Sequence, residues 1–268
     1  MRLFILSDLH ITAPEHPHYE ALLRWIREHR GSDSVFVFAG DVFDLFWGGN
    51  SYFLERYHSF FAEIEGAAEL GATFHFLEGN HDFLFRAALD RYFARKALGG
   101  AVPARILVHD ESCELTLAEK RFYIAHGDLV DREDRAYLFL RRLLRTAVSR
   151  WVFGLTPGKA VVSFGDFVSR LSRHSRADLS EASAQAARAR IRQIYRDFAL
   201  ERAREGADFV VLGHCHDSHE FGFELNGRRA VYCNMGFPQR EGTYLEWNSQ
   251  DQKLVHKPWF SVLANETG

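Results

Sequence analysis

Short apolar runs that end in polar residues recur along the chain. Each run is four or five residues long and is followed within three residues by an aspartate, an asparagine or a histidine. Such runs predict buried strands, and ligands of open α/β sheets bind just beyond the carboxyl ends of strands. One such cluster is typical of an ordinary turn, but five in the same position predict a shared site. The runs are residues 3–6, 35–39, 74–77, 122–125 and 209–212.

Helical periodicity fills the intervals between the first three runs. Residues 51–70 carry apolar side chains at i, i+3 and i+4 spacing, and residues 18–30 and 83–98 also predict helices. The alternation of strand and helix over residues 1–130 predicts an α/β fold.

Short strands return after residue 206. Residues 219–225 and 229–233 flank Asn226-Gly227, a strong signal for a two-residue β-hairpin turn. Residues 243–247 and 253–257 predict a further antiparallel pair at the end of the chain.

The segment between these two parts is basic and mostly helical, with a break expected at residues 154–158. Residues 132–176 contain ten basic and three acidic residues, a net charge of +7, together with many apolar residues. This pattern favours a surface that contacts anionic lipid or phosphate. The alternative is a helical insertion that packs on its own partner helix and leaves its arginines in solvent. The basic residues are Arg132, Arg135, Arg141, Arg142, Arg145, Arg150, Lys159, Arg170, Arg173 and Arg176.

These patterns divide the chain into three parts. Residues 1–130 and 206–260 are expected to form the core, residues 131–205 a basic, amphipathic lid or cap, and residues 261–268 a tail. A length of 268 residues fits one large domain with such an insertion.

Composition narrows the class of protein and its location. The net charge of -3 argues against a protein that coats nucleic acid along its whole surface. Three cysteines without a spacing pattern, and no apolar run near 18 residues, predict a chain of the reducing cytoplasm without a membrane span.

The polar residues after the five runs form a mixed set of oxygen and nitrogen ligands. Such a set suits Mn²⁺, Mg²⁺, Fe or Zn²⁺ better than a soft metal, and Cys215 is expected to point away. Seven ligands are too many for one ion with an open position, but fit two ions that share a carboxylate. Two such ions, roughly 3.5–4 Å apart, can hold a bridging hydroxide for attack at phosphorus. The seven residues are Asp8, His10, Asp41, Asn80, His126, His214 and His216.

The order and spacing of these motifs resemble the calcineurin-like metallophosphoesterase superfamily across residues 6–216. The resemblance implies a two-sheet β-sandwich flanked by helices, and two divalent ions, with Mn²⁺ expected and Mg²⁺, Fe and Zn²⁺ as alternatives. It also implies that Asp41 bridges the ions and that His81 assists the leaving group, so Asp41, Asn80 and His81 are the expected catalytic residues. The implied ligand sets are Asp8, His10, Asp41 and His216 for one ion, and Asp41, Asn80, His126 and His214 for the other.

Residues 40–48 are similar to the aromatic-rich segment of UDP-2,3-diacylglucosamine hydrolases, enzymes of lipid A synthesis. The stretch 173–176 resembles a phosphate-contacting segment of those enzymes, so Arg173, Ser175, Arg176 and Trp47 are expected to contact substrate. Asp44 and Asn50 are further candidates for the pocket wall. Many of those hydrolases carry arginine in place of His81, threonine in place of Cys215 and Arg-Pro soon after the last histidine.

The leading hypothesis is therefore a hydrolase that splits the pyrophosphate of a nucleotide-linked lipid sugar into UMP and a lipid 1-phosphate. The basic segment would cover the acyl chains and contact the anionic inner membrane from the cytoplasmic side. One alternative is another metallophosphoesterase, either a cyclic-nucleotide phosphodiesterase or a phosphatase. The other is a nuclease that uses the +7 segment as a track for nucleic acid. The density of apolar residues in that segment disfavours a stable nucleic-acid partner.

Overall fold

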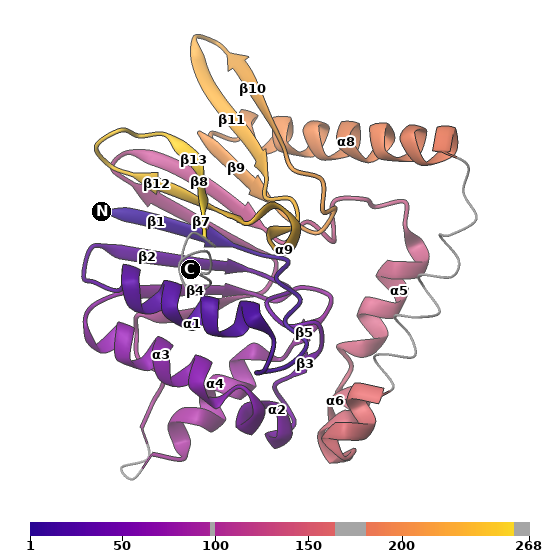
Figure 1. The fold of residues 1–268 in the computed structure, drawn as a ribbon. Coiled ribbons are helices and arrows are strands. Elements are labelled where there is room, and N and C mark those ends of the chain that lie inside the picture. Colours follow the sequence, from indigo (N-terminus) through magenta and orange to yellow (C-terminus); the bar gives the residue numbers. More distant parts are fainter. Residues whose placement is uncertain (97–99, 164–180, 260–268) are drawn as a thin grey trace, which may run out of the picture.

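Two β-sheets lie face to face in the computed structural model, with helices on both outer sides (Figure 1). The structure describes residues 1–96, 100–163 and 181–259. The α/β fold class expected from the sequence is confirmed, because the described residues form two large sheets and helices that flank them.

The first sheet contains four parallel strands and two antiparallel ones. Its order is β13-β12-β1-β2-β4-β6, and the three neighbouring pairs among β1, β2, β4 and β6 are parallel. The carboxyl ends of these four strands therefore lie at one edge. The strands are β1 (Arg2–Leu6), β2 (Ser34–Ala39), β4 (Thr73–Leu77), β6 (Ile106–His109), β12 (Thr243–Asn248) and β13 (Leu254–Pro258).

The second sheet has the order β10-β11-β9-β8-β7, and its central strands β8 and β9 are parallel. The expected hairpin is confirmed: Asn226 and Gly227 both have positive φ, as a type I′ turn requires. The strands are β7 (Ser112–Leu117), β8 (Lys120–Ala125), β9 (Phe209–Leu212), β10 (His219–Leu225) and β11 (Arg228–Asn234), and a separate pair is formed by β3 (Phe46–Trp47) and β5 (Asp82–Phe83).

Helices α1 (Pro17–His29) and α3 (His58–Glu69) cover the outer face of the first sheet (Figure 1). Aromatic rings fill the contact between these helices and the sheet. Phe60 of α3 packs edge-on against Phe38 of β2, with ring centroids 5.6 Å apart. The single helix expected over residues 51–70 is wrong, because α2 (Ser51–Arg56) ends at Tyr57 before α3 begins. Tyr57 is buried and its hydroxyl donates to the carbonyl of Ile11, so a tertiary contact accompanies the break.

The core has two apolar layers. Between the sheets, Phe122 of β8 packs edge-on against Trp247 of β12 at 5.2 Å. On the outer face of the second sheet, α8 (Glu181–Arg204) buries Tyr195 and two alanines against β9, β10 and β11. Two further helices are α4 (Phe85–Ala94) and α9 (Pro238–Glu241).

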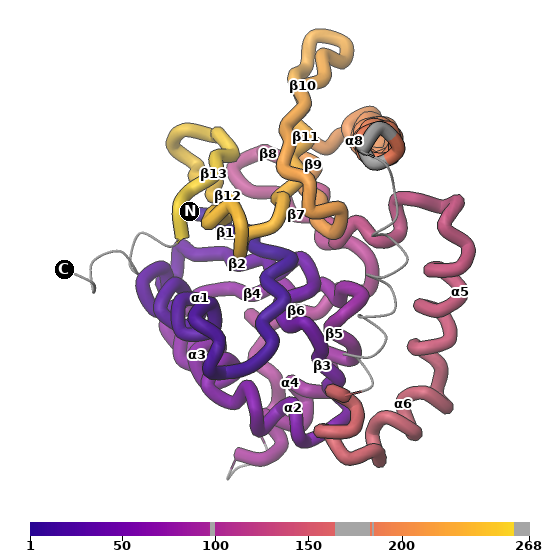
Figure 2. Tube along the Cα trace, turned by 45° about the vertical axis from the view of Figure 1, so that its right-hand side comes forward, coloured from indigo at the N-terminus to yellow at the C-terminus, as the bar shows by residue number. Residues whose placement is uncertain are grey.

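Helices α5 (Arg135–Leu144) and α6 (Ala147–Leu155) stand beside the edge to which β1, β2 and β4 point (Figures 1 and 2). The expected break is confirmed, because α6 ends at Leu155, just before Pro157. A second break lies between α5 and α6. There Thr146 caps the start of α6, and the Thr146 side chain accepts from the backbone N–H of Ser149. The division into core, lid and tail stays a prediction, although the part of α8 from Ile191 onward packs on the second sheet.

The candidate metal centre

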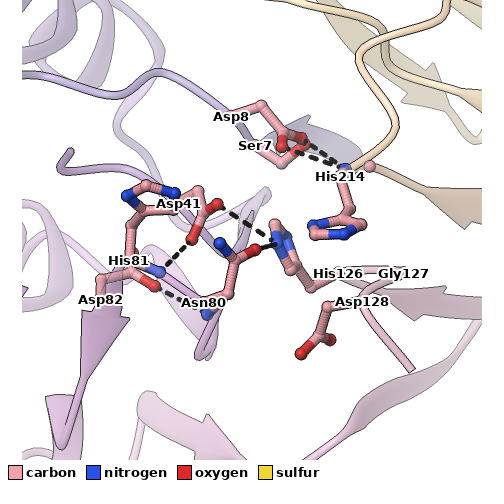
Figure 3. Close-up of polar contacts among 12 residues, drawn as sticks. Ser7, Asp8, Asp41, Asn80, His81, Asp82, His126, Gly127, Asp128 and His214 are labelled. Carbon is pink, nitrogen blue, oxygen red and sulfur yellow. Dashed lines mark hydrogen bonds and ion pairs between the residues drawn. The ribbon is translucent and has the colours of Figure 1, made fainter. Parts of the chain in front are cut away.

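Seven side chains converge at the carboxyl ends of five strands from both sheets. Figure 3 shows Asp8, Asp41, Asn80, His126 and His214 among them. The loops are held together by backbone hydrogen bonds, including Asp8 N–H to Gly40 O at 3.1 Å and Gly213 N–H to His126 O at 2.8 Å. The structure thus brings together all seven residues expected to bind metal. Asp8 and His10 follow β1, Asp41 follows β2, Asn80 follows β4, His126 follows β8, and His214 and His216 follow β9.

Five of these seven residues have a backbone conformation that L residues rarely adopt. Asp8, His10, Asp41, His214 and His216 have φ values of 53°, 45°, 53°, 65° and 52°. Non-glycine residues with positive φ cost free energy and are concentrated at functional sites, where the surrounding fold over-determines them. The strand ends therefore turn sharply into the site, and the strain of the turns is maintained by the rest of the fold.

Two glycines let the loops approach one another closely. A Cβ at Gly79 would collide with the carboxylate of Asp41, and a Cβ at Gly213 would collide with Asp8 and Ser7. Glycine is required at both positions because a carboxylate occupies the space of the missing side chain.

The first group of ligand atoms comes from Asp8, His10 and His216, and these atoms lie within 4.8 Å of one another. Nε2 of His216 lies 3.3 Å from Oδ1 of Asp8, and Nε2 of His10 lies 3.2 Å from Nε2 of His216. Two imidazole nitrogens and a buried carboxylate oxygen therefore face a common point.

The second group comes from Asp41, His126 and His214, with Asn80 beside it. Nδ1 of His126 lies 2.9 Å from the carbonyl oxygen of Ala39, which can only accept, so Nδ1 carries the proton. In the neutral ring, Nε2 then presents a lone pair to Oδ1 of Asn80 at 3.1 Å and Oδ2 of Asp41 at 3.4 Å. Three lone-pair atoms facing one another fit a cation placed between them, as metal-ligating histidines typically show.

Asp41 lies between the two groups. Its Oδ2 atom is 3.4 Å from Nε2 of His126 and 3.8 Å from Nε2 of His10, while Oδ1 accepts from the backbone N–H of His81 at 2.8 Å. The side chains thus form the two sets expected from the resemblance, with Asp41 common to both.

The electrostatics of the site also favour cations. Burial opposes ionisation of Asp41, yet the neighbouring imidazoles, His126 first, hold the pKa of Asp41 well below its usual value. Burial likewise disfavours the charged form of His126, but Asp41 raises the pKa of His126 well above its usual value. The buried carboxylates therefore stay negative at neutral pH and demand positive charge beside them, from protons or from metal ions.

Asp82 shapes the loop that carries Asn80. It is buried, and its two oxygens accept from the backbone N–H groups of Gly79 at 2.7 Å and Val42 at 2.9 Å. Burial and the nearby charge of Asp41 raise the pKa of Asp82 to about 6. Asp82 therefore orients the loops after β2 and β4.

His81 lies at the rim of the site with its ring edge-on to His10, at a centroid distance of 4.8 Å. Its Nδ1 lies 2.6 Å from the carbonyl oxygen of Asp44, so this nitrogen donates and Nε2 is left for a substrate. Asp44 also places Oδ1 3.5 Å from Nδ1 of His10. Asp44 thus contacts both histidines, as expected of a residue beside the pocket.

Asp128 connects the site to α5. Its Oδ2 atom accepts from the Tyr137 hydroxyl at 2.5 Å and from Nε of Arg141 at 2.7 Å. The Tyr137 ring in turn lies 5.9 Å from the ring of His214. The motif His126-Gly127-Asp128 marks this carboxylate in the sequence, but its two partners on a later helix carry no local signal.

Five residues expected to contact substrate or line the pocket are placed otherwise or not described. Trp47 is a correction: it is 2% exposed and packs between Phe83 and Phe153, so in this structure it is a core residue. Asn50 is a second correction, because its side chain donates to the carbonyls of Phe153 and Thr156 and ties the end of α6 to the core. The expected contacts Arg173, Ser175 and Arg176 lie outside the described residues.

Residues 1–218 match the model of the calcineurin-like phosphoesterase family. The UDP-2,3-diacylglucosamine hydrolase of Aeromonas salmonicida (strain A449) is 25% identical over 96% of this chain and 94% of its own length. The hydrolase of the same name from Neisseria gonorrhoeae (strain ATCC 700825 / FA 1090) is 29% identical over 81% of this chain and 82% of its own length. The solved structure of a novel archaeal phosphodiesterase covers 96% of this chain and 99% of its own, with 12% identity and a TM-score of 0.44.

The family match includes every residue of the two ligand groups. Divalent metal ions are implied for this family, and the donor set described above can hold them. The chain therefore belongs to the calcineurin-like phosphoesterase family and is a metal-dependent phosphoesterase.

Proposed function

We propose that this enzyme hydrolyses the pyrophosphate of a nucleotide-linked lipid sugar of the UDP-2,3-diacylglucosamine class, releasing UMP and a lipid 1-phosphate. The observation that carries the proposal is the position of a basic, apolar helix pair directly beside a site with two sets of metal ligands. The name shared by the curated relatives, which align along most of the chain, points to the same substrate.

Helices α5 and α6 present apolar side chains that no other described part of the chain covers. Phe139, Val148, Trp151 and Leu155 are 68–70% exposed. Large exposed apolar side chains gathered on one helix pair are typical of a binding site for a lipid or a membrane. A track for nucleic acid would not require it, so the surface favours an acylated substrate.

The helix pair is held to the core of the fold by polar contacts at three points. Arg141 binds Asp128, Arg145 lies 3.6 Å from Glu78, and Asn50 holds the end of α6. A lipid bound along these helices would therefore have its polar head close to the ligand groups.

When bound, two divalent ions would supply a nucleophile at neutral pH and offset charge on the phosphoryl oxygens. Asp8, His10, Asp41 and His216 would hold one ion, and Asp41, Asn80, His126 and His214 the other. His81, whose Nδ1 donates to the Asp44 carbonyl, faces the leaving phosphate with Nε2 and donates from that atom when its ring is doubly protonated. Mn²⁺ is the proposed ion, with Mg²⁺, Fe and Zn²⁺ as alternatives.

We also propose that the enzyme works at the cytoplasmic surface of the inner membrane. In the described residues, no helix combines the length and the apolar character needed to cross a bilayer. Contact would instead come from the exposed face of α5 and α6 together with the basic residues beside it.

A substrate panel tests the proposal. The full chain is loaded with Mn²⁺, and kcat/KM is measured for UDP-2,3-diacylglucosamine, a cyclic nucleotide, an aryl phosphodiester and single-stranded DNA. We expect kcat/KM for the lipid pyrophosphate to exceed the others by several orders of magnitude, because only that substrate uses the apolar surface beside the metal centre. A higher value for the cyclic nucleotide or for DNA would replace the proposal with the corresponding alternative.

A further inference from the structure

A second cluster of metal-ligand side chains lies where the edges of the two sheets meet. His75 belongs to β4, His109 ends β6, and Cys113 belongs to β7 of the other sheet. One donor atom from each lies within 4.8 Å of the other two. None of the three belongs to the metal centre described above.

Strand geometry explains the convergence. Strands β4 and β6 are parallel, with His75 opposite Leu107, so His75 and His109 project from the same face of the first sheet. In β7, Cys113 is fully buried while its neighbours Ser112 and Glu114 are more exposed, so Cys113 faces the space between the sheets. Three strands from two sheets therefore direct their donors to one point.

The two imidazoles are already in contact. Nδ1 of His75 lies 2.9 Å from Nε2 of His109, and the rings are stacked with centroids 5.1 Å apart. Burial lowers the pKa of His75 to about 4 and also lowers the pKa of His109, so both rings are neutral at pH 7. Neutral imidazole is the form that binds metal.

A hydrogen-bonded histidine pair accounts for two members of the cluster but gives no role to the sulfur that approaches from the other sheet. We propose that His75, His109 and Cys113 bind one borderline divalent cation such as Zn²⁺. On binding, the Cys113 thiol loses its proton to solvent and forms the metal–sulfur bond. Water completes the coordination on the side where His109 is half-exposed.

The donor set distinguishes this site from the main one. Two imidazoles and a thiolate favour Zn²⁺ or Co²⁺ over Mn²⁺ and Mg²⁺, whereas the main centre contains carboxylate and amide oxygens. A cation here would connect β4 and β6 of the first sheet to β7 of the second. Because it binds only the folded chain, it stabilises the contact between the sheets.

Cobalt spectroscopy tests the proposal. Metal-free full-length protein is titrated with Co²⁺, and the near-ultraviolet charge-transfer band of a cobalt–thiolate bond is followed together with bound cobalt. We expect the band in the wild type and in Cys215→Ser, a substitution between the ligands His214 and His216 in the sequence. We also expect the band in Asp41→Ala, which disrupts the main centre, together with one equivalent of bound Co²⁺. Cys113→Ser and His109→Ala are expected to abolish it.

His109→Ala keeps the test decisive, because this half-exposed residue can be replaced with little effect on folding. Its activity in Mn²⁺ should equal that of the wild type, and its Zn²⁺-dependent rise in melting temperature should be smaller than that of the wild type. The proposal is overturned by a wild type without the band, by a band that persists in Cys113→Ser, or by a band that requires Cys215.

Discussion

Asp41 is the residue on which the two ligand groups depend. One of its oxygens lies 3.4 Å from His126 and 3.8 Å from His10, which belong to different groups. We therefore predict that Asp41→Ala loses nearly all activity and most of its bound Mn²⁺ while the fold persists. Bound Mn²⁺ is measured by elemental analysis, and circular dichroism checks the fold. Asp90→Ala, which removes an exposed carboxylate of α4, is the control. Two retained Mn²⁺ ions per chain in Asp41→Ala would contradict a bridging role.

The contribution of His81 to the hydrolysis rate should increase with the basicity of the leaving group. An alkoxide needs a proton, and donation of this kind contributes roughly 10²–10⁴-fold to rate. A phosphate leaving from an anhydride has a second pKa near ~6 and needs little protonation, so a fixed positive charge can replace the histidine. We predict that His81→Ala loses much more rate on an alkyl phosphodiester than on a UDP-lipid pyrophosphate, and that His81→Arg retains much of the pyrophosphatase rate.

The measurement is kcat/KM for both His81 variants on both substrates. Equal loss by His81→Arg and His81→Ala on the pyrophosphate would mean that the histidine is an obligatory proton donor, or that the pyrophosphate is not the substrate. A wild-type preference for the pyrophosphate in the substrate panel separates these two explanations.

At the scale of elements, α5 is positioned by a buried ion pair. The side chains of Arg141 and Asp128 are only 12% and 4% exposed, and removing one partner of such a pair leaves an uncompensated charge at a cost of about 3–5 kcal/mol. We predict that Arg141→Gln raises KM for the lipid substrate strongly and changes kcat/KM for a small aryl phosphodiester much less. Arg142→Gln, an exposed neighbour on the same helix, is the matched control and should behave like the wild type. An equal loss on both substrates would show that Asp128 acts on the metal centre and not on α5.

His75, buried where β4 meets β6, makes the free energy of unfolding decrease in acid. The unfolded chain protonates His75 near pH 6.5, whereas burial in the folded chain lowers its pKa to about 4. The unfolded state then binds more protons, so stability falls as pH decreases through this window. For His75 this amounts to about 2 kcal/mol between pH 7 and pH 5. Urea unfolding of chelator-treated protein at both pH values should show this loss, and His75→Gln should show a smaller one.

At the scale of the whole molecule, membrane contact should depend on the arginines that face solvent. Arg141 and Arg145 do not face solvent. The Arg141 side chain is 12% exposed and pairs with Asp128, and the Arg145 side chain is 22% exposed and pairs with Glu78. We predict that neutralising the exposed set weakens binding to anionic vesicles, and that the binding falls with salt because exposed charges are screened beyond about 8 Å at physiological ionic strength. The exposed set is Arg132, Arg135, Arg142 and Arg150.

Co-sedimentation with vesicles of anionic and neutral lipid measures this binding. The control removes the same number of exposed charges elsewhere, at Arg30, Arg204, Arg229 and Lys253. Equal loss in both variants would indicate a general charge effect, and unchanged binding in the first would remove the membrane-facing surface from the proposal.

The sequence alone determined the features that depend on local pattern. Apolar runs followed by polar residues located β1, β2, β4, β8 and β9, and Asn226-Gly227 located the hairpin. It also predicted that seven scattered side chains meet, because these five strands carry their ligands at carboxyl ends that share one edge of the sandwich. Strand period and turn chemistry are properties of neighbouring residues, so they can be read without the fold.

The tertiary structure decided the features that depend on contacts between distant segments. It buried Trp47 against α6, turned Arg141 and Arg145 inward, divided the helix at Tyr57 and placed α8 on the second sheet. It also brought His109 and Cys113 to His75. The local pattern around each of these residues allows either a buried or an exposed side chain. Which one occurs depends on the free energy of packing against residues far away in the chain, and that is known only once the sheets and helices are assembled.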